Sequence, residues 1–390
     1  MILKRLVIPG NFVEAHLYFD FLWLIDSEGA IKALDLAEYI EARLNGDGGA
    51  AHKLFARNDR LVTSGNFTRA SDQTPDVQRL LGSSEPIVMS SGDVDRFSYH
   101  HIAHHQLEEP LDVRFYNGRA FVGVPGALVQ FRAPGRRDLS IEAARGSKGK
   151  QLNARRVFDE GTPIHLQCRF GIINIACGAE GGFYGLGALS SDTRWEVHPT
   201  KIVQTSFYAE VNAAGIGHVG SAARLHLSGT RMRNVDGPIS NDDQSERREV
   251  ASVDDEDMEA MARADRITHG KSDDVRAERM YLTTKQALVI MSDDSLRLFA
   301  YAKDAEFLHT DARVIELPSP ASRILSTTTT CGKIVTECDD EICVLDKWKW
   351  HRIFDEPVYS TRGYPSSKWY RQLLTIVAED RTELVFICEE

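Results

Sequence analysis

Short apolar runs separated by turn-forming residues recur along most of the chain. The clearest pair is 287–291 followed by 296–301, with Ser292, Asp293, Asp294 and Ser295 between the runs. Two apolar runs joined by a short polar segment are typical of a β-hairpin. The same pattern occurs at 333–338 with 342–345, and at 373–377 with 384–388. The hydrophobic pattern therefore predicts a series of hairpins toward the C-terminus.

Earlier segments continue the series. The further pairs of runs are 21–25 with 30–36, 61–64 with 67–70, 120–124 with 128–131, and 170–176 with 183–189. After a first interval of about 98 residues, the turns recur every 40 to 65 residues, and four-stranded propeller blades need a similar period. The chain resembles β-propeller proteins in architecture, although no Trp-Asp or kelch signature repeats in register. We therefore expect an all-β fold, a closed propeller of seven or eight four-stranded blades in one domain spanning 1–390.

The first nine residues are apolar at Leu3, Leu6, Val7 and Ile8 and have no hairpin partner nearby. A closed propeller leaves only short, protected sheet edges. We therefore predict that this segment pairs with the hairpin at 373–388 and completes its sheet.

Composition agrees with a soluble globular protein, because 42% of the 390 residues are hydrophobic and 26% are charged. The net charge of −11 argues against a protein that binds nucleic acid over its whole surface. The six cysteines lie mostly in apolar runs without C-x-x-C spacing, which favours reduced core residues. Neither a signal peptide nor a long apolar span is visible, so we expect a cytoplasmic protein without a membrane partner. No motif of a hydrolase, kinase or phosphate-binding loop is found.

Four of the histidines lie close together at 100–105, and such a cluster suggests a metal-binding site. On a strand, His100 and His104 share one face, and His101 and His105 share the other. A pair on one face needs a third ligand from a neighbouring strand to bind one ion. The alternative is a set of polar positions at a blade edge.

A basic segment runs from 132 to 156, with much of its charge in Gly-rich sequence typical of loop tips. Its positive residues are Arg132, Arg136, Arg137, Arg145, Lys148, Lys150, Arg155 and Arg156, against only Asp138 and Glu142. Loops on a rigid scaffold often carry recognition. The segment is therefore either a site for an acidic or phosphate-bearing partner or a solvated basic loop.

An acidic insertion is expected at about 234–278, where the spacing between turns is longer. A helix N-terminal pattern at Ser252 and a glycine at Gly270 predict a short helix near 253–268. Met258 and Met261 contribute to its narrow apolar stripe, so the helix needs a surface to pack on. The interpretations are a solvated acidic excursion or a segment that docks on a partner.

Two hypotheses about function follow from these features. The first is a non-catalytic binding or scaffold module, without a cofactor, that presents its charged loops to a protein partner as one subunit of a larger assembly. The second is a hydrolase or lyase with a divalent metal at the His100 to His105 cluster.

Overall fold

The computed structural model describes residues 1–44, 48–56, 75–101, 106–133, 153–169, 172–178, 183–187, 194–198, 204–208, 212–219, 222–229, 277–282, 286–291, 295–300, 313–318, 323–365, 367 and 369–388. The chain divides into two compact units. Unit 1 comprises Met1–Pro163 together with Leu317–Glu390, and unit 2 comprises Ile164–Glu316.

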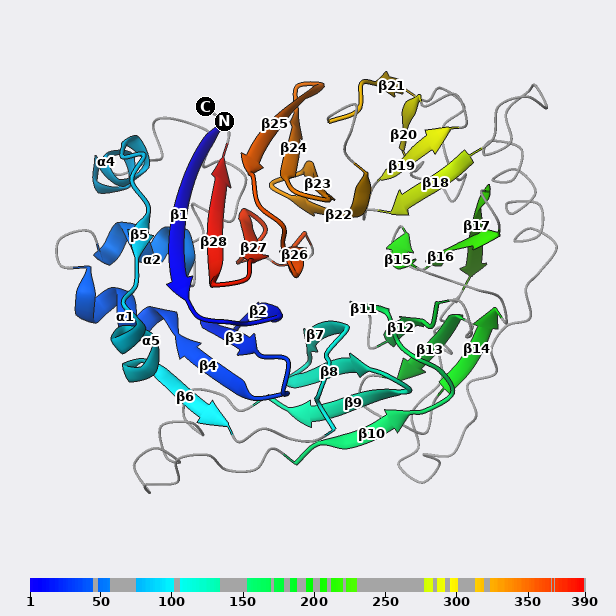
Figure 1. Cartoon of the computed structure of the whole chain (residues 1–390), viewed down its shortest axis with the longest axis horizontal. Coiled ribbons are helices and arrows are strands. Elements are labelled where there is room, and N and C mark those ends of the chain that lie inside the picture. Colours follow the sequence, from blue (N-terminus) through cyan, green and yellow to red (C-terminus); the bar gives the residue numbers. More distant parts are fainter. Residues whose placement is uncertain are drawn as a thin grey trace, which may run out of the picture. The chain divides into compact units, whose positions relative to one another are not determined.

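Unit 1 contains four of the described sheets (Figure 1). The first contains β2 (Glu14–Tyr18), β3 (Phe21–Ile25), β4 (Ile31–Asp35) and β6 (Ser98–His101). The second contains β7 (Asp112–Tyr116), β8 (Arg119–Val124), β9 (Ala127–Arg132) and β10 (Arg155–Phe158). The third contains β22 (Ile324–Thr330), β23 (Lys333–Cys338), β24 (Ile342–Asp346) and β25 (Lys349–Phe354). The fourth contains β26 (Ser360–Gly363), β27 (Leu373–Val377), β28 (Arg381–Cys388), β1 (Ile2–Pro9) and β5 (Ile87–Val88).

Unit 2 contains the other described sheets. One is formed by β11 (His165–Arg169), β12 (Ile172–Ala176), β13 (Phe183–Gly187) and β14 (Arg194–His198). The next has the three strands β15 (Gln204–Tyr208), β16 (Asn212–Val219) and β17 (Ala222–Gly229). The last is formed by β18 (Ala277–Leu282), β19 (Gln286–Met291), β20 (Leu296–Ala300) and β21 (Arg313–Ile315).

The strand order confirms the predicted all-β propeller type of fold. Apart from β5, neighbouring strands of every described sheet are antiparallel and follow one another along the chain, with β1 following β28. Strands such as β3, β24 and β27 are buried at all five positions, because each sheet is covered on both faces. The hairpin predicted at 373–388 is therefore confirmed. So are the described parts of the other predicted hairpins, at 21–36, 120–131, 170–189, 287–301 and 333–345.

The predicted number of blades is wrong. Six of the described sheets have at least four strands, and the seventh has three, so the described residues form six full blades instead of seven or eight. The long first interval explains part of the error, because it contains one blade and a group of helices. The hairpin predicted at 61–70 and the acidic insertion up to 276 lie outside the described residues.

The predicted pairing of the N-terminal strand with the hairpin at 373–388 is confirmed. β1 pairs with β28 along its whole length, from Ile2 opposite Cys388 to Pro9 opposite Arg381. Leu6 and Ile8, two of the apolar residues of β1, are fully buried. Burying these side chains, worth about 1.5–3 kcal/mol each, holds the first residues of the chain in the last sheet of unit 1.

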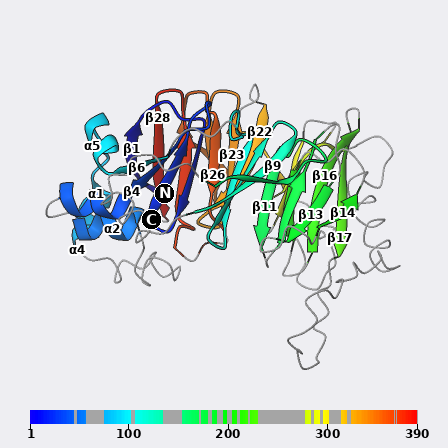
Figure 2. The same ribbon diagram turned by 90° about the horizontal axis from the view of Figure 1, so that it is seen from below.

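The segment between β4 and β6 forms helices that the hydrophobic pattern did not reveal. They are α1 (Leu36–Arg43), α2 (Gly48–Phe55), α4 (Pro75–Gly82) and α5 (Ser91–Arg96). The Asp35 carboxylate accepts a hydrogen bond from Glu38 N and caps α1, and Ser90 caps α5 in the same way. The helices lie beside β1 (Figures 1 and 2), where Leu54 and Leu81 join the core formed by Leu6 and Phe386.

Within the described residues, no helix is long and apolar enough to span a membrane.

Candidate functional site

The turns of unit 1 lie at two opposite ends of its strands (Figure 2). Because consecutive connections in an antiparallel sheet alternate between ends, the first and third connections of each sheet share one end. In unit 1 this end contains the turns at 19–20, 117–118, 331–332 and 347–348, the connection 364–372 and the start of α1 directly after β4, where Leu36 N donates a hydrogen bond to Asp20 O at 3.2 Å. Hydrogen bonds join neighbouring sheets there, from Gly118 N to Tyr18 Oη (2.7 Å) and from Tyr370 Oη to Asp20 Oδ1 (3.0 Å). We call it the basic end, for the charges described below.

Two turns at the basic end place bulky residues in a conformation that normally favours glycine. Four of its hairpins have two-residue turns with positive φ, which is the geometry of type I′ turns. Asn117 and Gly118 are the residues that such a turn prefers. Phe19 (φ 51°) and Trp348 (φ 68°) are not. Backbone strain of this kind costs roughly 1–3 kcal/mol per residue, and it is most often retained at functional sites.

The same aromatic side chains face solvent. Phe19 is 59% exposed, Trp348 is 48% exposed and Trp369, in the connection from β26 to β27, is 37% exposed. The three come from the β2, β22 and β26 sheets, and in unit 1 β26 lies between β22 and β2. The Phe19 ring contacts Tyr18 at a centroid distance of 4.3 Å. The basic end therefore presents aromatic surface from three neighbouring sheets.

The turns and strand ends at the basic end contain more basic than acidic residues. The basic residues at this end are Arg119, Arg132, Arg155, Arg156, Lys347, Lys349 and Arg371. Arg119 and Arg132 are directly opposite each other on β8 and β9, although like charges in that position destabilise a sheet. Of the acidic residues there, Asp346 pairs with Lys333 at 2.5 Å, Asp20 accepts a hydrogen bond from Tyr370, and Asp35 caps α1. Glu38, in the first turn of α1, is exposed.

The opposite end of unit 1, which we call the acidic end, has the reverse charge. Its turns and connections contain Asp26, Glu28, Glu108, Glu109, Asp159, Glu160, Asp339, Asp340, Glu341, Asp355, Glu356, Glu379 and Asp380. The basic residues in these connections and at the adjoining strand starts are Arg323 and Arg381. Arg381 pairs with Glu356 and Asp380, each at 2.9 Å, and with Glu383 at 3.0 Å. Unit 1 is thus electrostatically polarised along its strands.

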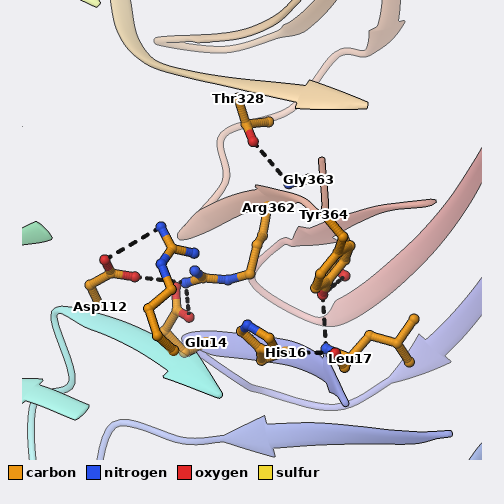
Figure 3. Close-up of polar contacts among 10 residues, drawn as sticks. Glu14, His16, Leu17, Asp112, Thr328, Arg362, Gly363 and Tyr364 are labelled. Atoms are coloured by element: carbon orange, nitrogen blue, oxygen red, sulfur yellow. Dashed lines mark hydrogen bonds and ion pairs between the residues drawn. The ribbon is translucent and has the colours of Figure 1, made fainter. Parts of the chain in front are cut away.

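A buried charge cluster joins the first strands of three sheets in unit 1 (Figure 3). Arg362 on β26 donates hydrogen bonds through Nη2 to Glu14 Oε2 on β2 at 2.6 Å and to Asp112 Oδ1 on β7 at 2.9 Å. All three side chains are at least nine-tenths buried. Beside them, Tyr364 Oη accepts from Leu17 N at 2.8 Å and shares a hydrogen bond with Thr375 Oγ1 at 2.7 Å. The cluster therefore connects β26 with β2 and β7.

Burial shifts the protonation of this cluster. Desolvation raises the pKa of Glu14 to about 7, even though Arg362 acts in the opposite direction. Desolvation, followed by the charge of Arg362, lowers the pKa of His16 well below its ordinary value, so this imidazole is neutral. Burial also raises the pKa of Tyr364 to about 12. Perturbed groups of this kind can mark an active site, but these side chains are closed off from solvent, and the geometry assigns them to holding strands together.

The structure describes only some of the residues predicted as sites. Arg132, Arg155 and Arg156 are exposed at the basic end. Arg136, Arg137, Arg145, Lys148, Lys150, Met258 and Met261 lie outside the described residues. His100 and His101 belong to β6, whereas His104 and His105 are not described. Among the described residues, no group of three or more His, Cys, Asp or Glu is arranged to hold a metal ion. The metal hypothesis stays a prediction.

Sequence reasoning missed Phe19, Trp348 and Trp369, as well as the Glu14–Arg362–Asp112 cluster. An aromatic residue within an apolar segment is normally predicted to lie in the core. Only the two paired strands on either side of Phe19 show that it occupies a turn. The cluster joins residues that are 98 to 348 positions apart. Cys177, Cys338 and Cys343 are buried. Burial raises the pKa of the Cys338 thiol to about 11 and that of the Cys343 thiol to about 12.

No family model and no curated protein sequence matches this chain. Among solved structures, it is similar to BBS1N, in a complex with ARL6DN, with 8% identity and a TM-score of 0.48 over 98% of this chain and 93% of the other. The Pan2 WD40 domain of Neurospora crassa has 7% identity and a TM-score of 0.46 over 98% and 90%. The N-terminal domain of Nup159 has 8% identity and a TM-score of 0.46 over 99% and 96%. The fold assignment above rests on the strand order of this chain itself.

Proposed function

We propose that this protein is a non-catalytic binding module that contacts a protein partner through the basic end of unit 1. The observation that carries the proposal is the placement of Phe19 and Trp348, which are exposed aromatic residues at turn positions with positive φ. Both side chains are about half exposed to solvent, and a non-glycine residue at such a φ costs backbone strain in the folded protein.

An exposed aromatic side chain contributes to the binding free energy when a partner covers it. Aromatic side chains are enriched in the residues that dominate binding energy, and two-residue turns hold them in fixed positions at low entropic cost. Hydrogen bonds from Gly118 to Tyr18 and from Tyr370 to Asp20 fix the turns of adjacent sheets relative to one another. The basic end is therefore a preorganised surface within unit 1.

A comparison of proteins captured by three forms of the full chain tests this proposal. The turn variant combines Phe19→Asn with Trp348→Gly, because Asn and Gly suit positive φ and remove the aromatic rings. The matched control is Tyr359→Ser, since Tyr359 is 57% exposed but lies at the acidic end. Each form is tagged, used as bait in extract from the native source, and compared by quantitative mass spectrometry.

The proposal predicts a partner captured in near-equal amounts by the unmodified chain and by Tyr359→Ser, and reduced at least about tenfold for the turn variant. Equal capture by all three forms would place binding elsewhere. Loss of the partner with Tyr359→Ser alone would move the interface to the acidic end.

A further inference from the structure

A second surface of unit 1 lies at the acidic end, around the starts of the first strands of its four sheets. We propose that this surface docks a basic protein segment that carries apolar side chains between its lysines or arginines. The inference goes beyond the function proposed above, because it concerns the opposite end of unit 1 and a different partner.

Large apolar side chains are exposed at the same position in three of these sheets. Leu111 directly precedes β7, Tyr359 directly precedes β26, and Leu325 is the second residue of β22. Their exposed fractions are 42%, 57% and 43%. Val13 directly precedes β2 and is half-buried. A single exposed apolar residue is common on a protein surface, but apolar residues that recur at one position on neighbouring sheets indicate an interaction site.

Backbone hydrogen bonds show that these positions are equivalent. Three of the residues donate to the end of the second strand of their own sheet, from Val13 N to Ile25 O (2.9 Å), from Leu111 N to Gly123 O (2.8 Å) and from Tyr359 N to Val377 O (2.7 Å). Leu325 lies at the corresponding place in the β22 sheet, where the pairing shifts between Ile324 and Ser326. All four residues therefore lie where a first strand leaves the connections of the acidic end.

The buried cluster next to these positions holds the four strands together. The following residues along the strands are Glu14, Asp112, Ser326 and Ser360. Arg362 pairs with both Glu14 and Asp112, and the Ser360 side chain interacts with Glu14. Ser326 Oγ donates to Glu337 Oε2 at 3.0 Å, and the charge of Glu14 also acts on Glu337. Each of the four positions is therefore one residue away from the same group of interacting side chains.

These strands are close enough for one segment to reach all four positions. Cα atoms of β2 lie within 8 Å of Cα atoms in both β7 and β26, and the same holds for β22 and β26. Three such steps cover roughly 25 Å, whereas an extended segment of ten residues spans roughly 33 Å. A single segment of this length can therefore contact Leu111, Tyr359 and Leu325 together.

Charge complementarity selects a basic segment. Exposed acidic residues lie in the connections that carry the apolar side chains, with Glu108 and Glu109 before Leu111 and two further acids at 355–356 before Tyr359. Glu109 N donates to Ser27 O at 3.1 Å, which places the connection before β7 beside the acidic turn at 26–28. A segment that lies across the apolar residues is therefore bordered by carboxylates.

Basic residues at or near this end leave its field negative. They include Lys32, Arg323, Arg352 and Arg381, and the acidic residues of the connections outnumber these four by more than three to one. Lys32 pairs with Asp95, which lies outside those connections, and Arg381 is shared by three carboxylates. The remaining negative field attracts lysine and arginine side chains, and it repels nucleic acids and anionic lipid surfaces.

Fluorescence anisotropy with designed peptides tests the inference on the full chain. The principal probe, the Lys peptide, is a labelled twelve-residue peptide that alternates Lys with Leu and Phe. Matched peptides replace every Lys by Glu, or every Leu and Phe by Ser. Titrations are made at 50 and 300 mM NaCl, and sedimentation velocity of the unmodified chain measures self-association.

Three variants and one control are compared with the unmodified chain. The apolar variant combines Leu325→Ser with Tyr359→Ser, and the charge variant combines Glu108→Lys with Asp355→Lys. Leu111→Ser alone keeps the test valid if the apolar variant unfolds, and thermal unfolding of every variant checks its fold. The turn variant is the matched control, because it removes exposed aromatic side chains from the opposite end of unit 1.

We expect the Lys peptide to bind the unmodified chain and the turn variant with equal affinity, and to bind more weakly at 300 than at 50 mM NaCl. The apolar variant should lose at least about tenfold in affinity, and Leu111→Ser at least about threefold. The charge variant should lose affinity mainly at 50 mM NaCl. Bound peptide should slow amide hydrogen exchange at 107–111, 323–326 and 355–359.

The inference fails if the apolar variant and Leu111→Ser bind the Lys peptide as tightly as the unmodified chain does. Equal or tighter binding of the Glu or Ser peptide, or no binding of the Lys peptide, would also overturn it. Self-association that the apolar variant abolishes would show that a second copy of the chain occupies the surface instead of a basic segment.

The function proposed for the basic end is tested separately. Its partner depends on Phe19 and Trp348 and should still be captured by Tyr359→Ser, whereas the Lys peptide depends on Tyr359 and should still bind the turn variant. Failure of either proposal therefore leaves the other standing.

Discussion

The placement of Trp348 gives the most specific consequence at the level of single residues. Its φ of 68° lies where glycine is favoured, so Trp348→Gly should raise the free energy of unfolding by about 1 kcal/mol. Urea denaturation measures the change. Gly118→Ala is the converse control, because a Cβ at Gly118 meets no neighbouring atom while its φ is +73°. Gly118→Ala should therefore lower the free energy of unfolding by about 1 kcal/mol. A loss of stability in Trp348→Gly would show that the indole stabilises the fold.

Arg362 pairs with the buried carboxylates of Glu14 and Asp112, and removing Arg362 leaves both without their shared partner. Breaking such a pair costs about 3–5 kcal/mol, so Arg362→Ala should be strongly destabilising in chemical denaturation. Arg381→Ala is a suitable comparison, since its ion pairs lie at the partly exposed acidic end and a pair of that kind contributes about 0–1 kcal/mol. Similar losses in the two variants would contradict a special role for the buried cluster.

Glu14 makes stability depend on pH in an unusual direction. Its pKa is about 7 in the folded chain, against an ordinary value of 4.5. The folded state therefore holds a proton that the unfolded state releases, and the stability this proton supplies is present below pH 4.5 and is lost as pH rises to about 7. Relative to Glu14→Gln, the unmodified chain should lose up to about 3 kcal/mol between pH 5 and pH 8. Urea denaturation of both proteins at several pH values measures this difference, and a constant difference would refute the shift.

At the scale of elements, the packing of β26 against β22 leaves no room for a side chain at Gly363. An added Cβ would overlap the carbonyl oxygen of Thr329, and Gly363 N also donates to Thr328 Oγ1 at 3.1 Å. Gly363→Ala should therefore destabilise unit 1 by about 1–3 kcal/mol, because overlap with backbone cannot be relieved by a rotamer change. Thermal unfolding measures the loss. Gly126→Ala, at a site with open space but positive φ, separates steric overlap from loss of glycine freedom.

The hairpins and the N-terminal strand could be predicted from sequence because their signals are local. A run such as 373–377 is apolar at consecutive positions, and a polar turn follows it directly. The helices between β4 and β6 escaped this reasoning. α1 is capped by Asp35, yet it directly follows the buried strand β4 with no loop to mark the change. The blade count failed because it treated the interval from 28 to 126 as two blades.

At the scale of the molecule, the charge of unit 1 is sorted between two ends, and the net charge conceals this. In the β22 sheet, for example, the turn at 339–341 is acidic and the following turn at 347–348 is basic. The sequence contains this signal, but it becomes readable only when the strands on both sides of each turn are known. The buried cluster carries no such signal, since Glu14 and Arg362 come together only in the folded chain.

If the basic end of unit 1 is the binding surface, amide hydrogen exchange detects it most directly. Exchange is measured on the full chain alone and with its captured partner. We expect slower exchange at 17–21, 346–350 and 369–373 in the complex, with little change at 355–359 and 378–381. Protection confined to 355–359 and 378–381, with unchanged exchange around Phe19 and Trp348, would contradict it.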